Sequence, residues 1–458
     1  MSIDDLVDPR TGVLLDLAPS PPRADMPSGW TTWGATTGRT TAFAPWRADS
    51  YGFGASLGDQ AAARGAALGE AIERYCGNAV PERLAVTARS HRDLGGAALD
   101  PMRLALYSVT QYRSPGFPFV PFTRDLPVSW VEALDLHTSA ETLVPASLAY
   151  LDYFHGPRAD EPATHSPAYS GIATGTSRPA ALRSALEELL ERDATGIWWA
   201  SGAPTHAWDD GGRVTGRLGR PGVGGTVRLR LLEVPRELPT PVVAALVEDE
   251  TAGVVGFGSA CRADHPTAAA KALVEALGGL RLGRDLDDPS SDVWAAVRSG
   301  RVESHVYLPH RSDRQYVDDA WSPAAAHPWS SLTDLPPVAQ VYLDPRMQAS
   351  PLQRLRPSAA LPLPARQDTR DDSAVVAALL ADLGAAGVGA YAVDLTTPDV
   401  AACGLHVVRV ITPELVGNGP PAFPLHGGRR LYEVPFRLGW VERPLTEADL
   451  VTTPLPLA

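Results

Sequence analysis

The sequence Ala67-Leu-Gly-Glu-Ala-Ile-Glu-Arg74 returns later in the chain as Ala185-Leu-Glu-Glu-Leu-Leu-Glu-Arg192. The two copies agree at the alanine, the leucine, both glutamates and the arginine. A weaker third copy, Ala272-Leu-Val-Glu275-Ala-Leu, keeps only the beginning. Because the copies are too far apart for a solenoid, they predict a pseudo-symmetric core in which similar helices cover sheets.

Segments with helical periodicity and capping signals contain these copies, and strand-like runs lie between the segments. The predicted helices are 59–78, 178–201, 265–282 and 372–387. The predicted strands are 227–234, 242–247, 254–258, 302–307, 338–342, 389–393 and 406–411. This mixture predicts an α/β or α+β fold whose sheets are covered by helices.

Polar and proline-rich stretches mark the expected boundaries. We predict an N-terminal extension over 1–50 and one domain over 51–458. Within that domain we expect a loop insertion near 209–225 and a proline-rich irregular segment over 321–365.

The charge of the chain restricts its partners. The 458 residues include 40 Lys and Arg against 53 Asp and Glu, a net charge of −13, which repels a polyanion and argues against nucleic-acid binding. No apolar run reaches the ~20 residues that span a bilayer, and the beginning lacks a secretory pattern, so we expect no membrane contact and a cytoplasmic location. The cysteines lack metal or disulfide spacing.

The repeated helix places two acids and one guanidinium on a shared face, because residues three and four apart are neighbours on a helix. The two sets are Glu70, Glu73 and Arg74, and Glu188, Glu191 and Arg192. Facing helices of this kind could bind magnesium through carboxylate oxygens and phosphate through arginines, without the P-loop that this sequence lacks. The alternative is an ordinary exposed Glu–Arg helix pair, worth about 0.3–0.5 kcal/mol.

The sequence resembles the YcaO family. The paired helices, the second of which continues to Asp193, carry the likeness, and further matches extend it over residues 50–458. These matches are Gly171-Ile-Ala-Thr-Gly175, Gly256-Phe-Gly258, Asp394-Leu-Thr-Thr-Pro-Asp399 and Val407-Val-Arg-Val-Ile-Thr-Pro413.

The resemblance implies an ATP- and magnesium-dependent cyclodehydratase. Such an enzyme phosphorylates a backbone amide oxygen and converts Cys, Ser or Thr of a ribosomal precursor peptide into a thiazoline or oxazoline. It also implies a ThiF-like partner protein that binds the leader peptide, and a homodimer is a further expectation.

The resemblance also assigns roles to residues. Glu70, Glu73, Glu188 and Glu191 would hold magnesium, whereas Arg74, Arg192 and Arg281 would contact the nucleotide. The family often ends in a proline-rich tail that enters the active site. Here the end is Thr453-Pro-Leu-Pro456-Leu-Ala458, and the carboxylate of Ala458 would act as a base.

Several positions depart from the family pattern. Phe53 replaces a lysine, Ala66 a serine, Thr176 an asparagine and Ala180 an acid. In the family the third helix normally carries a glutamine near the position of Gly278. Two alternatives therefore stay open. The chain could be a degenerate, non-catalytic scaffold or peptide-binding subunit, or a thioamide-forming member of the family.

Overall fold

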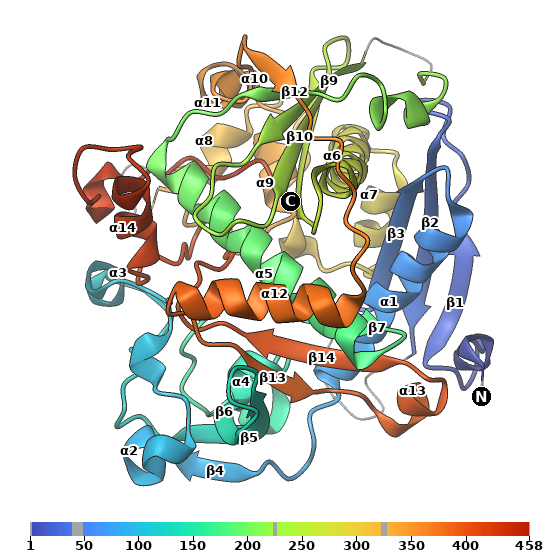
Figure 1. The fold of residues 1–458 in the computed structure, drawn as a ribbon. Helices are drawn as coiled ribbons and strands as arrows, with labels where there is room; N and C mark the ends of the chain where they lie inside the picture. The colour runs from blue at the N-terminus through green and yellow to red at the C-terminus, as the bar shows by residue number, and fades with distance from the viewer. Residues whose placement is uncertain (1, 39–48, 223–226, 322–327, 458) are drawn as a thin grey trace.

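The computed structural model describes residues 2–38, 49–222, 227–321 and 328–457. Its strands form three sheets that are antiparallel throughout, except where β8 and β12 pair in parallel. The fold is therefore of the predicted mixed class, on its α+β side (Figure 1).

The first sheet has the order β1-β2-β3, with β1 at Leu14–Pro19, β2 at Trp30–Thr37 and β3 at Tyr51–Leu57. This sheet joins the segment predicted as an N-terminal extension directly to the rest of the chain, because β2 pairs with β3 along its length.

The second sheet has the order β4-β5-β13-β14-β7, and β6 pairs with β5 at its side. Its strands are β4 (Val86–Arg89), β5 (Val128–Asp135), β6 (Glu141–Pro145), β7 (Ile172–Gly175), β13 (Tyr391–Asp394) and β14 (His406–Ile411).

The third sheet has the order β11-β10-β9-β8-β12. Its strands are β8 (Ala207–Asp209), β9 (Val227–Glu233), β10 (Val242–Asp249), β11 (Val254–Cys261) and β12 (Ala360–Pro362).

Three long helices each follow a strand at the edge of a different sheet. Helix α1 (Gln60–Asn78) follows β3, α5 (Arg178–Ser201) follows β7, and α6 (His265–Asp287) follows β11. Each begins at a side-chain cap, supplied by Asp59, Ser177 and Asp264 respectively.

These three strand–helix units are arranged cyclically. Helix α1 also packs on β7, α5 on β11 and α6 on β3, so each helix contacts its own strand and that of the next unit. This arrangement is the pseudo-symmetric core that the repeated helix sequence predicts.

Glycines allow the helices to lie directly on their strands. A Cβ atom at Gly54 of β3 would overlap the backbone carbonyl of Ala63 in α1, and one at Gly256 of β11 would overlap that of Ala276 in α6. Both glycines belong to Gly-Phe-Gly triplets, 52–54 and 256–258.

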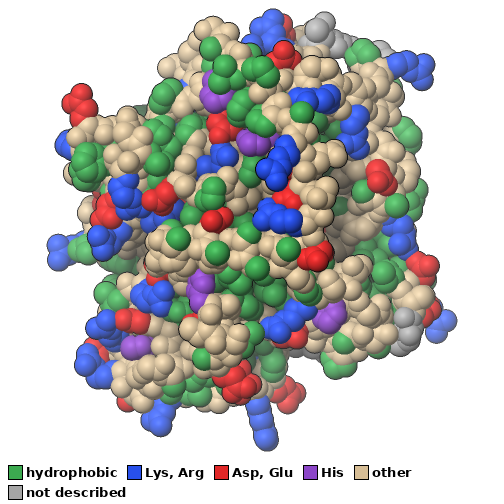
Figure 2. Space-filling view, in the orientation of Figure 1, with side chains coloured by type: hydrophobic (Ala, Val, Ile, Leu, Met, Phe, Trp, Pro, Cys, Tyr) green, Lys and Arg blue, Asp and Glu red, His purple; other side chains and the backbone are tan. Residues whose placement is uncertain are grey.

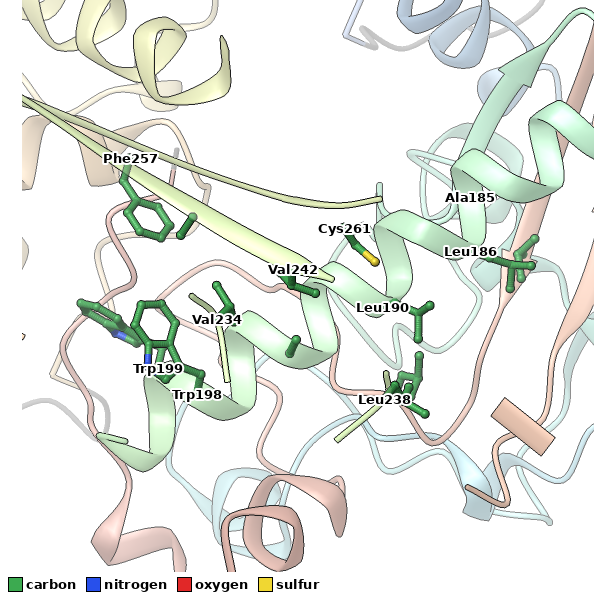
Figure 3. Close-up of a cluster of buried hydrophobic side chains, with 14 of the residues drawn as sticks. Ala185, Leu186, Leu190, Trp198, Trp199, Val234, Leu238, Val242, Phe257 and Cys261 are labelled. Carbon is green, nitrogen blue, oxygen red and sulfur yellow. The ribbon is translucent and has the colours of Figure 1, made fainter. Parts of the chain in front are cut away.

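Helix α12 (Asp372–Ala385) lies across α5, and α14 (Arg430–Arg437) packs near its C-terminal end (Figure 1). The largest core cluster joins α5 to the third sheet, and Figure 3 shows side chains of α5 gathered with those of β10 and β11. Trp198 and Trp199 are buried within it. The shorter helices are α2 (His91–Leu94), α3 (Val109–Arg113), α4 (Ala146–Ala149), α7 (Asp292–Arg298), α8 (Tyr316–Ala320), α9 (Pro337–Val341), α10 (Pro345–Gln348), α11 (Ser350–Gln353) and α13 (Pro398–Ala402).

Two predicted strands are wrong. Residues 302–307 form irregular chain with one 3₁₀ turn, and residues 338–342 lie in or beside α9. The Gln340 side chain accepts a hydrogen bond from the Leu308 backbone nitrogen and donates one to its carbonyl, at 2.8 and 2.7 Å. The proline at the start of α9 favours helix, and the β-branched pattern is overridden by this tertiary contact.

The segment predicted as a loop insertion, 209–225, packs against residues 25–29 as far as it is described. The backbone nitrogens of Ser28 and Gly29 donate hydrogen bonds to the carbonyls of Arg220 and Leu218. Among the described residues, no helix has both the length and the apolarity needed to cross a membrane.

Candidate active site

The repeated glutamates converge at one junction. There the edge strands β3, β7 and β11, which precede the three long helices, approach one another. The backbone nitrogen of Phe53 in β3 donates a hydrogen bond to the Glu70 carboxylate at 2.9 Å, and that of Gly171, just before β7, donates one to Glu188 at 2.9 Å. Both donors lie 17 residues before their acceptors. The two helix copies are therefore structurally as well as sequentially equivalent.

The second glutamate of each copy binds the strand of the next unit. The Thr174 backbone nitrogen in β7 donates to Glu73 at 2.8 Å, and the buried Ser259 hydroxyl in β11 donates to Glu191 at 2.7 Å. Edge strands have backbone donors that are not used by a neighbouring strand, which is why carboxylates can be held there.

Arg74 and Arg192 lie among these acids. Arg74 pairs with Glu70 at 3.0 Å and with Asp49 at 3.1 Å, and its guanidinium lies 4.7 Å from the centre of the Tyr169 ring. Arg192 pairs with Glu191 at 3.0 Å and with Glu188 at 3.4 Å. Its Nε is buried and has no hydrogen-bond partner, so this arginine keeps an unused donor.

The third helix contributes Glu275, a residue of the weaker third copy for which the sequence predicts no role. Glu275 forms an ion pair with Lys271, and its charge acts on both Glu70 and Arg192. The predicted Arg281 lies at the same junction, with its guanidinium 5.4 Å from the centre of the Phe53 ring.

The electrostatics of the junction favour added positive charge. Burial, together with the charges of Glu70 and Glu188, raises the pKa of Glu73 to about 8 despite Arg74. Burial likewise raises the pKa of Glu191. Burial also opposes ionisation of Glu275, but Lys271 and Arg192 outweigh it and lower the Glu275 pKa.

The donor set suits magnesium bound together with phosphate. Among the described residues, no three His, Cys, Asp or Glu side chains are placed closely enough to hold a metal ion alone. Magnesium is commonly held by one or two carboxylates plus the phosphates of a nucleotide, rather than by a complete protein cage. The excess of acids and the free Nε of Arg192 fit such a joint ligand.

Two of the altered positions contact each other. A Cβ atom at Gly278 would lie 3.9 Å from the Phe53 ring. The aromatic side chain therefore occupies the space beside this glycine. Ala66 lies on α1 against Gly54, and Thr176 and Ala180 flank the N-cap of α5.

The predicted catalytic terminus, Ala458, lies outside the described residues. The preceding tail is attached near the C-terminal end of α5, where the carbonyls of Thr453 and Pro454 accept hydrogen bonds from Trp199 Nε1 and the Tyr342 hydroxyl, both at 2.7 Å.

The fold and the site together define a protein suited to binding a metal and phosphate. Acidic side chains gather at one junction, and two arginines suited to phosphate lie among them. A family model described as YcaO cyclodehydratase, ATP- and Mg²⁺-binding, matches residues 52–416. The chain belongs to this YcaO family. Its description agrees with the predicted cofactors, ATP and magnesium.

Solved structures share the fold. A heterocyclase in complex with substrate and cofactor is 20% identical, with a TM-score of 0.70 over 98% of this chain and 56% of its own. YcaO from Methanopyrus kandleri, bound with AMPPCP and Mg²⁺, is 19% identical, with a TM-score of 0.55 over 88% of this chain and 86% of its own.

An uncharacterized protein of Methanothermobacter thermautotrophicus is 27% identical over 220 residues, which are 46% of this chain and 53% of that protein. The chain thus spans about half the length of this relative and of the first heterocyclase.

Proposed function

We propose that the protein is an ATP- and magnesium-dependent cyclodehydratase that forms azolines in a ribosomal precursor peptide. The observation that carries the proposal is the convergence of Glu70, Glu73, Glu188 and Glu191 with Arg74 and Arg192 at the junction of three sheet edges. The family match supports the same reading.

The protein's own residues would hold and orient the reactants. Magnesium-bound ATP supplies the phosphoryl group that turns an amide oxygen into a good leaving group. The carboxylates would bind the metal on its protein side, and Arg74 and Arg192 would bind phosphate oxygens. Backbone amides and Ser259 already hold the carboxylates in place, so little reorganisation is required on binding.

We include a precursor peptide and a ThiF-like leader-binding protein in this proposal as partners, on the strength of the family resemblance. A homodimer is proposed on the same basis. Ala458 as a catalytic base also stays a proposal.

The Phe53–Gly278 contact supports a second candidate function. Phe53 replaces an expected lysine and lies beside Gly278 of α6, so a non-catalytic scaffold that no longer binds nucleotide is the alternative.

Calorimetric titration with magnesium and a non-hydrolysable ATP analogue separates the two functions. The proposal expects binding by the wild-type protein and a loss of at least tenfold in Glu73→Gln and Glu191→Gln, because each removes a charged metal ligand. Glu442→Gln, at an exposed position, is the matched control and should bind normally. Folding of each variant is checked by circular dichroism.

Absence of binding up to millimolar nucleotide, with a candidate partner also present, would favour the scaffold. Where binding is found, the mass of a processed peptide distinguishes the reactions. Azoline formation removes one water per ring, whereas thioamide formation exchanges oxygen for sulfur.

A further inference from the structure

The chain contains a single lysine, Lys271, among its 40 basic residues. Arginine presents a planar, permanently charged fork, whereas lysine presents a compact ammonium with three rotatable donors. The location of this one ammonium is therefore informative in a chain that otherwise uses guanidinium groups.

Lys271 is connected to the candidate active site through Glu275. Its ammonium pairs with Glu275 one turn along α6, and the two side chains are 38% and 45% exposed. A Cβ atom at Gly258 would lie 2.5 Å from that of Glu275, and the next residue, Ser259, holds Glu191. Because β11 is an edge strand, side chains from α6 and α5 can meet beyond it.

The face of α6 that carries Lys271 also carries Gly278, which lies beside Phe53. Lys271, Glu275 and Gly278 follow the spacing of one helix face, and Gly278 lies against Phe53. Phe53 stands where the family resemblance predicts a lysine. Lys271 and Gly278 are seven positions apart, which is about 10 Å along the helix. Lys271 therefore lies on the face of α6 that approaches β3.

We propose that Lys271 binds a phosphate oxygen of the nucleotide and that Glu275 holds its ammonium in the ligand-free protein. This inference rests on the proposed nucleotide-binding function and assigns it a further binding residue. Binding exchanges one anionic partner of the ammonium for another, with no covalent step. The partial exposure of both side chains leaves the ammonium accessible to an incoming anion.

Chemical labelling can follow this lysine by itself. The wild-type protein is treated with an amine-selective acetylating reagent, with and without magnesium and the non-hydrolysable ATP analogue, and Lys271 acetylation is measured by peptide mass spectrometry. We expect about tenfold slower acetylation with the ligand, while the N-terminal α-amine reacts at an unchanged rate. Unchanged acetylation of Lys271 at a ligand concentration that calorimetry shows to be saturating would overturn the proposal.

Variants separate phosphate binding from simple charge pairing. We expect Lys271→Met to weaken nucleotide binding by about 10- to 100-fold, as for the loss of a charge-assisted hydrogen bond. The double variant Lys271→Met/Glu275→Gln should stay equally weak, because Gln cannot replace the ammonium. Recovery of wild-type affinity in the double variant would show that Lys271 only neutralises Glu275, and would overturn the proposal.

The two proposals fail in different ways. If the wild-type protein binds no nucleotide, the proposed function falls and this inference falls with it. If the wild type binds but Lys271 is neither protected nor required, the proposed function stands and only this inference is wrong.

Discussion

Gly54 shows at the scale of a single residue how the site is assembled. Its lack of a side chain lets α1 lie against β3, and this close contact brings Glu70 within reach of the Phe53 backbone nitrogen. The sequence marks both glycines of the Gly52-Phe-Gly54 triplet, but the reason for them is visible only when the helix is in place.

Gly54→Ala is expected to destabilise the protein by about 1–3 kcal/mol, because the new methyl group would overlap the Ala63 carbonyl. Gly65→Ala is the control on α1, where a Cβ atom would meet nothing within 4 Å. That change should stabilise by about 0.5–1 kcal/mol through helix propensity. Urea denaturation measures both, and equal effects of the two substitutions would contradict the packing argument.

Individual site residues differ in how far the sequence predicts them. The repeat identifies Glu70, Glu73, Glu188 and Glu191, because the two copies of one pattern coincide in structure as well as in sequence. Ser259 carries no such signal, since a serine in a strand is common and only the packing of β11 on α5 makes it a partner of Glu191. Glu275 has a weak signal in the third helix copy.

At the scale of elements, α5 is held by both of its faces. While Glu191 faces the site, Asp193 accepts two hydrogen bonds from Arg430 of α14, at 3.0 and 2.6 Å, and one from the Val416 backbone nitrogen at 2.9 Å. The side chains of Asp193 and Arg430 are 5% and 8% exposed. This buried pair attaches α14 to the helix that carries the site.

Arg430→Met should therefore destabilise the protein by about 3–5 kcal/mol, because it leaves the Asp193 charge buried with fewer partners. The neighbouring Arg429 has a side chain that is 85% exposed, and Arg429→Met should change stability by less than about 0.5 kcal/mol. Guanidinium denaturation at neutral pH provides the comparison. A loss below 1 kcal/mol for Arg430→Met would show that α14 contributes little to the position of α5.

Over the whole molecule, three sheets and three helices share one junction, so no sheet alone contains the site. Positive and negative side chains are interspersed on the face shown in Figure 2. The stability of this assembly depends on buried groups as well as on the junction. His165 is one of them, with its ring nitrogens 2.8 Å from the Ser166 carbonyl and 3.2 Å from the Ser147 hydroxyl.

Burial lowers the pKa of His165 from 6.5 to about 4 in the folded protein. Between these values the unfolded chain binds the additional proton, so the His165 contribution is complete above pH 6.5 and is lost as the pH falls toward 4. We expect the free energy of unfolding to fall by up to about 1.4 kcal/mol per pH unit in this window.

Urea denaturation from pH 7 to pH 4 tests this dependence in His165→Gln, which should lose that part of the slope even if its stability at pH 7 is lower. His305→Gln is the control, because the His305 side chain is 73% exposed. An unchanged slope in His165→Gln would assign the acid sensitivity to other groups.

The three capped helices, their repeated acids and the family can be predicted from the chain alone, because helix periodicity, capping and side-chain spacing are local properties. Tertiary structure decided that β3, β7 and β11 lie at sheet edges and meet, that Val338–Tyr342 is largely helical, and that the charge of Glu275 acts on Glu70 and Arg192 of the other units. These outcomes depend on packing between segments far apart in the chain, and no local pattern records which edges of the sheets will face one another.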